Sequence, residues 1–120
     1  MPLKLKDISS YLSFAKKLSN TSEEILKKTP SNRIKINFKS DKSPVTKIDM
    51  AIERKLRSMI NKSFPDHGIF GEEYKNKTNN SPFLWVIDPI DGTKNFINGN
   101  SNFGTLISLC IDYKPVIGII

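Results

Sequence analysis

Residues 84–96 read LWVIDPIDGTKNF, an apolar run followed at once by two closely spaced carboxylates. Four consecutive apolar residues suit a buried strand. Because Pro89 has no N–H to donate, we expect this strand to end near Asp88. Gly92 gives the backbone freedom to turn, and Thr93 can then cap a short helix. The segment therefore predicts a strand end, with its carboxylates, beside a helix N-terminus.

Asp88 and Asp91 lie three residues apart at this predicted strand end. Carboxylates so close together repel each other unless a proton or a cation lies between them. A hard divalent ion such as Mg²⁺ takes oxygen ligands and also binds phosphate, an anion that a helix N-terminus favours as well. Asp, Pro and Gly also build ordinary turns, so this segment alone leaves a metal site and a plain turn both open.

The composition is that of one small globular domain, with 120 residues, 38% of them hydrophobic, and a net charge of +7. The lysines are spread along the chain without a basic run or interleaved aromatic residues, so we expect a solvated surface and no nucleic-acid partner. No apolar run has the length of a membrane span or the form of a secretory signal, so we expect no membrane partner. Cys110 is the only cysteine and lies in an apolar run, which predicts a small core residue in a reducing cytoplasm.

Hydrophobic periodicity predicts two helices and several short strands. One helix covers 7–28, where the polar residues 20–22 can interrupt it, and the second has an apolar stripe over 48–60. Strands are expected over 33–39, 69–70, 84–88, 103–112 and 115–120, with a polar turn over 39–46 and a tight turn over 112–114. Thr46 precedes the second helix as its N-cap with Asp49 at the third position, and this capping role alone can explain Asp49. We therefore expect an α+β fold, in which two helices pack on one face of an antiparallel β-sheet and the metal site lies at the edge of the sheet.

Acidic residues are scarce, twelve against nineteen basic ones, yet four of them fall where strands are expected to end. They are Glu72, Glu73, Asp88 and Asp91, and neighbouring glycines leave room for the backbone to approach a ligand. If the two strands are neighbours, these carboxylates share one edge of the sheet. Two metal ions held there can clamp a phosphoryl group and lower the pKa of a bound water.

Three segments carry a resemblance to a known family. Residues 43–49 read SPVTKID, residues 71–73 read GEE and residues 88–93 read DPIDGT. In this order they resemble the motifs of the inositol monophosphatase family of metal-dependent phosphatases, and the resemblance covers nearly the whole chain. Within the family, three segments of this chain resemble the histidinol-phosphate phosphatases more than the inositol enzymes. These segments are residues 64–68, 92–97 and 103–107.

The resemblance implies a set of metal ligands and two or three Mg²⁺ ions. Glu72, Asp88 and the carbonyl oxygen of Ile90 would hold the first ion. Asp88 would bridge to a second ion that Asp91 also holds. Asp49 would support a third, weaker position near Glu72, with Thr46 close by.

The resemblance also implies how the substrate is held and attacked. Glu72 and Thr93 would orient the water that attacks phosphorus, while the backbone N–H groups of Gly92 and Thr93 would hold phosphate oxygens. Glu73 would support the site without binding metal. Phosphoryl transfer depends on positioning and charge neutralisation, so no nucleophilic side chain is required. The expected substrate is a small phosphomonoester, either histidinol phosphate or an inositol monophosphate, and the full-length enzyme is expected to be a homodimer.

The length of the chain limits this prediction. In the family, a further aspartate for the second metal follows in a tryptophan–aspartate motif far downstream, and this chain contains no such motif. We therefore expect residues 1–120 to form the N-terminal α+β portion of the family's layered αβαβα fold, with catalysis only when a C-terminal half completes it. The alternatives are a non-catalytic truncated remnant and a family member that binds protein or RNA.

Overall fold

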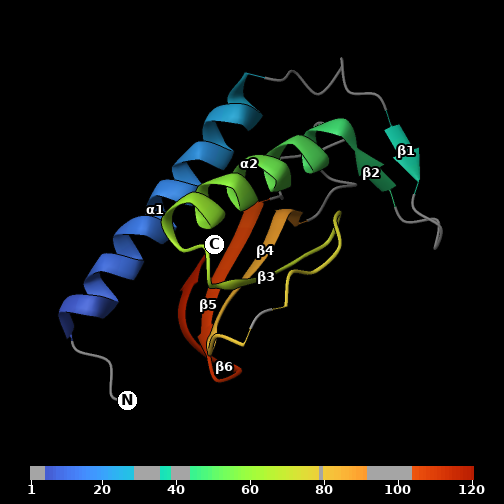
Figure 1. Ribbon diagram of the computed structural model, residues 1–120. Coiled ribbons are helices and arrows are strands. Elements are labelled where there is room, and N and C mark those ends of the chain that lie inside the picture. The colour runs from blue at the N-terminus through green and yellow to red at the C-terminus, as the bar shows by residue number, and fades with distance from the viewer. Residues whose placement is uncertain (1–4, 29–35, 39–43, 79, 92–103) are drawn as a thin grey trace.

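Two helices and six strands make up the part of the chain that the structure, a computed structural model, describes (Figure 1). The described residues are 5–28, 36–38, 44–78, 80–91 and 104–120. In chain order the elements are α1 (Leu5–Lys27), β1 (Ile36–Phe38), β2 (Pro44–Thr46), α2 (Lys47–Ser63), β3 (Gly68–Gly71), β4 (Phe83–Asp91), β5 (Gly104–Ile111) and β6 (Lys114–Ile119). Figure 1 shows α1 and α2 side by side over one face of the main sheet.

The two helices form where the apolar periodicity predicts them. α1 runs without a break through residues 20–22, so the expected interruption is absent. Its polar side chains there find partners: the Thr21 hydroxyl donates to the Lys17 carbonyl, and the buried Ser22 hydroxyl hydrogen-bonds that of Thr105 in β5. α2 begins directly after Thr46, as the N-cap prediction requires, although the Thr46 side chain is not described.

The main sheet has the strand order β3-β4-β5-β6. It is mixed and not purely antiparallel, since β3 pairs with β4 in parallel while the other neighbours are antiparallel. The short strands β1 and β2 form a separate antiparallel pair. The prediction of a polar turn over 39–46 is therefore wrong for residues 44–46, because backbone pairing with β1 makes them a strand.

The core lies between the helices and the sheet. α1 packs on β5 and β6, and α2 packs on β4. Apolar side chains of both helices meet alternate residues of the strands, and full burial of each stabilises the fold by about 1.5–3 kcal/mol. The buried apolar residues are Ala15, Leu18, Ile48, Ile52, Leu56, Ile60, Ile69, Trp85, Ile87, Ile107, Leu109 and Ile117. Cys110 is not among them: it is only half-buried, because alternation turns it to the other face from Leu109. Neither described helix is long and apolar enough to cross a membrane.

β4 extends past the proline that was expected to end it. The strand runs to Asp91, so the prediction that it ends near Asp88 is wrong. Its pairing with β5 passes from Asp88 opposite Leu106 directly to Asp91 opposite Gly104, with a register shift in between. Pro89 lies within this shift, where its missing N–H interrupts no regular ladder pair.

Candidate functional site

The parallel pairing of β3 with β4 brings two of the predicted metal ligands together. The last pair in this register is Gly71 with Ile87. Glu72 and Asp88 are therefore the next residues of two neighbouring segments, whose spacing in a sheet is about 4.8 Å. β3 and β4 are thus neighbours. This is the arrangement that the prediction from sequence required for the carboxylates of Glu72 and Asp88 to share one edge of the sheet.

Alternation along β4 assigns Asp88 to the face of the sheet away from the helices, and Glu72 follows β3 at the same end of the sheet. In β4, Ile87 is buried against the helices, so Asp88 belongs to the other face. In β3, Gly71 faces α2, because a Cβ at this position would lie 2.6 Å from the Glu53 carboxyl group. Glu72 follows directly, in a bend after the strand, and it is exposed.

The chemistry of this pair suits a hard divalent cation. Two carboxylates at about one strand spacing repel each other without a cation, and they offer only oxygen ligands, which fit Mg²⁺. Among the residues whose side chains are described, no group of three Asp, Glu, His or Cys is arranged to hold a metal ion. A complete site therefore needs at least one ligand from outside that set.

The remaining predicted ligands follow Asp88 in the chain. The backbone of Asp91 pairs with Gly104 after the register shift in β4. Bulges of this kind are common beside active sites, where they re-aim a side chain. The side chains of Ile90 and Asp91, and all of residues 92–103 with Gly92 and Thr93, lie outside the described part of the chain. Their roles stay predictions.

Asp49 lies in the first turn of α2 and is only 2% exposed. A carboxylate in the first turn interacts favourably with the helix dipole, which agrees with the capping role. Glu53 follows one turn later, and residues four apart share one face of a helix. Asp49 therefore belongs to the same buried face of α2 as Glu53. Its predicted metal role near Glu72 stays a prediction.

Glu53 is the residue that the sequence did not single out. Its side chain is completely buried, and its carboxylate accepts hydrogen bonds from the backbone N–H of Glu73 (2.9 Å) and of Tyr74 (3.1 Å). The Nε of Arg57 donates to the same carboxylate at 2.9 Å. A weak signal existed, since Glu53 lies in helical phase with Leu56 and Ile60 on the apolar stripe of α2.

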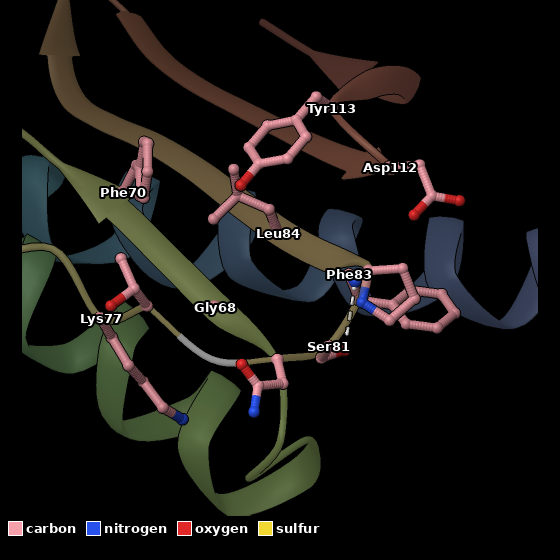
Figure 2. Close-up of a pocket in the computed structure, with 11 residues that line it drawn as sticks. Gly68, Phe70, Lys77, Ser81, Phe83, Leu84, Asp112 and Tyr113 are labelled. Carbon is pink, nitrogen blue, oxygen red and sulfur yellow. Dashed lines mark hydrogen bonds between the residues drawn. The ribbon is translucent and has the colours of Figure 1, made fainter.

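A cavity of about 490 Å³ opens elsewhere on the sheet (Figure 2). It lies around the start of β4 and the turn between β5 and β6. Figure 2 shows Phe70, Leu84 and Tyr113 on the face of the sheet turned away from the helices. Glu72 and Asp88 lie toward the opposite ends of β3 and β4 and do not line the cavity. The cavity is therefore distinct from the candidate metal site.

Known proteins resemble this chain in sequence and in structure. The bifunctional phosphatase IMPL2 of Arabidopsis thaliana, described as chloroplastic, is 38% identical over 99% of this chain and 36% of its own length. The histidinol-phosphatase of Mycobacterium tuberculosis is 38% identical over 72% of this chain and 34% of its own length. The IMPase of Thermotoga maritima superposes with a TM-score of 0.81 at 32% identity, covering 91% of this chain and 42% of that protein.

This chain therefore spans between about a third and a half of the length of the relatives that it matches. The match to the sequence model of the inositol monophosphatase family covers residues 7–120, which includes both strand ends that carry the candidate ligands. The superposition on this solved relative shows that the two share a fold. The chain belongs to the inositol monophosphatase family.

Proposed function

We propose that the protein hydrolyses phosphate monoesters of small alcohols, with Mg²⁺ held by Glu72, Asp88 and Asp91. The observation that supports this proposal is the parallel register of β3 and β4, whose last pair, Gly71 with Ile87, directly precedes Glu72 and Asp88. Phosphatases among the relatives support the reaction class. The finer proposal is that the substrate is histidinol phosphate or an inositol monophosphate, since relatives with both kinds of name match the chain.

The proposed ligand set is made of oxygen atoms. Glu72, Asp88 and the carbonyl oxygen of Ile90 would hold one Mg²⁺, Asp88 and Asp91 a second, and Asp49 would support a third. When bound, Mg²⁺ supplies charge neutralisation for the phosphate and lowers the pKa of a bound water. The carboxylates thus set where the anionic substrate can bind.

The chain's own groups would position the reacting partners. The Glu72 carboxylate and the Thr93 hydroxyl would orient the water that attacks phosphorus. The backbone N–H groups of Gly92 and Thr93 donate hydrogen bonds to phosphate oxygens. Such fixed donors stabilise the charge that develops in phosphoryl transfer.

An assay of phosphate release by the natural, full-length protein tests the proposed reaction. Release from histidinol phosphate or from inositol monophosphate should require Mg²⁺, stop when a chelator removes the ion and return when Mg²⁺ is restored. The ratio of kcat/KM for the two esters identifies the substrate. Absence of release from both esters at millimolar Mg²⁺ would contradict the proposal.

Matched substitutions test the site. Glu72→Gln and Asp91→Asn each remove one charge and should lower kcat/KM by on the order of 100-fold or more. Glu24→Gln is the control, because Glu24 is an exposed residue of α1. Activity that survives Glu72→Gln or Asp91→Asn as well as it survives Glu24→Gln would show that the ligand assignment is wrong.

A further inference from the structure

A partly buried ion pair of α2, between Glu53 and Arg57, binds the backbone of the segment that follows β3. The Glu53 carboxylate is completely buried and accepts three hydrogen bonds, from the N–H groups of Glu73 and Tyr74 and from the Nε of Arg57. A buried carboxylate is costly unless its oxygens are paired in this way. Because its oxygens already accept these donors, Glu53 is not placed to act as a metal ligand itself.

Arg57 holds the same segment through its carbonyl oxygens. Its guanidinium donates to the carbonyl of Tyr74 at 3.1 Å and to that of Lys75 at 2.9 Å, while its Nε binds Glu53. The guanidinium carbon also lies 5.8 Å from the centre of the Tyr74 ring. A planar guanidinium can meet all these acceptors at once, whereas a lysine ammonium is a single point charge. The segment is therefore held by both its N–H and its C=O groups.

Gly71 lets the Glu53 carboxylate come this close. A Cβ at position 71 would lie 2.6 Å from Cδ and from Oε2 of Glu53. Only glycine leaves the space that the carboxylate occupies. Glu53 thus contacts the residue before Glu72 and hydrogen-bonds the residue after it.

We propose that Glu53 and Arg57 are positioning residues, which fix the backbone of Glu72 for cation binding before the cation arrives. This inference rests on the proposed function, since it concerns the same metal site. A ligand carried by a segment that is already ordered binds a cation more tightly than one that must be ordered on binding. Groups that orient metal ligands typically contribute 10–100-fold to metal affinity.

Glu53→Gln is the variant that tests the proposal most finely. If the amide oxygen replaces Oε2, the bonds from Tyr74 and Arg57 remain, but the amide NH₂ then meets the N–H of Glu73. Mn²⁺ affinity, measured by electron paramagnetic resonance without substrate, should fall about 10–100-fold. The Mg²⁺ concentration for half-maximal phosphate release should rise by the same factor, while KM for the ester at saturating Mg²⁺ stays within about twofold.

Glu23→Gln is the matched control. Glu23 forms the same kind of i,i+4 pair, with Lys27, but on the exposed surface of α1. It should leave both the Mn²⁺ affinity and the Mg²⁺ dependence unchanged. Arg57→Lys keeps the charge beside Glu53 but loses the fork to the two carbonyls, so it should weaken Mn²⁺ binding by a smaller factor than Glu53→Gln.

A double-mutant cycle and hydrogen exchange separate positioning from a general loss of stability. Gly71→Ala should weaken Mn²⁺ binding, because the new Cβ clashes with the Glu53 carboxylate. In a Glu53→Ser background this clash is absent, so adding Gly71→Ala should cause no further loss of Mn²⁺ affinity. In the metal-free wild-type protein, the amides of Glu73 and Tyr74 should already be protected from exchange.

Equal Mn²⁺ affinity in the wild type and Glu53→Gln would overturn this inference alone. Fast hydrogen exchange of the Glu73 and Tyr74 amides in the metal-free protein would overturn it as well. This measurement uses the wild-type protein and does not depend on the folding of any variant. A wild-type protein that binds no Mn²⁺ would overturn the proposed function, and this inference with it.

Discussion

At the scale of single residues, His67 has a role that its loop sequence does not indicate. It is 7% exposed, and its ring stacks between Phe64 and Phe83 at centroid distances of 4.6 and 4.5 Å. The indole N–H of Trp85 donates to its Nδ1 at 3.0 Å, so Nδ1 carries no proton. Burial, and then the charge of Lys77, lower the pKa of His67 to about 4. At neutral pH His67 is therefore a neutral, buried residue that packs among aromatic side chains.

The lowered pKa predicts a specific dependence of stability on pH. The imidazole has a pKa of about 4 in the folded chain, against 6.5 for an ordinary histidine side chain. Between these values the unfolded chain binds more protons, so the free energy of unfolding falls as the pH drops from about 6.5 towards 4. The full loss is about 3 kcal/mol, at about 1.4 kcal/mol per pKa unit. Urea denaturation at pH 7.5 and at pH 5 should show about 2 kcal/mol of this loss, because pH 5 still lies above the folded-state pKa of about 4.

His67→Asn supplies the control for this pH dependence. The amide oxygen can still accept the N–H of Trp85, but the side chain does not titrate. This variant should be less stable at every pH, since ring stacking is lost, yet its stability should change less between pH 7.5 and pH 5. An unchanged pH dependence in His67→Asn would show that His67 is not its source.

At the scale of elements, the hairpin between β5 and β6 contains backbone strain. Asp112 and Tyr113 have φ values of 53° and 64°, in the left-handed region that glycine and asparagine favour. Tyr113 is 85% exposed, so its ring contributes little packing there. Tyr113→Gly should therefore stabilise the fold by about 0.5–1 kcal/mol, measured by thermal or urea unfolding.

Tyr113→Ala separates the backbone effect from the loss of the ring. Alanine also lacks the ring but keeps the Cβ that disfavours positive φ. It should give no gain in stability. If Tyr113→Gly destabilises the chain as much as Tyr113→Ala does, the ring and not the backbone conformation matters at this position.

The helices and most strands could be predicted because their signals are local. The stripe of α2 and the alternation of β5 lie within a few residues of each other in the sequence. The parallel register of β3 with β4 could not be predicted, since it depends on packing between segments apart in the chain. The continuation of β4 past Pro89 was missed because proline excludes a regular ladder but not a bulge.

The candidate site divides in the same way. Glycine and proline beside acidic residues at strand ends could indicate that Glu72 and Asp88 follow neighbouring strands, while their metal role stays a prediction. Glu53 could not, because in sequence it stands next to Arg54 and Lys55 and resembles a solvated charge. Its burial follows only from the close approach of α2 to Gly71.

At the scale of the whole molecule, one layer of helices and one sheet meet in a single core, and the candidate ligands Glu72 and Asp88 come directly after the last register pair of β3 and β4. The chain covers 36% and 34% of the two curated relatives reported above. The fold is shared with solved relatives over nearly the whole chain. The proposed phosphatase activity rests on whether the carboxylates at the ends of β3 and β4 bind one cation together.

Anomalous X-ray diffraction from crystals soaked in Mn²⁺ tests that joint binding directly, because Mn²⁺ replaces Mg²⁺ and can be located on its own. We predict a peak within about 2–2.5 Å of a carboxylate oxygen of Glu72 and of Asp88. Peaks found only elsewhere, or Glu72 and Asp88 oxygens too far apart to share the ion, would contradict the proposed site.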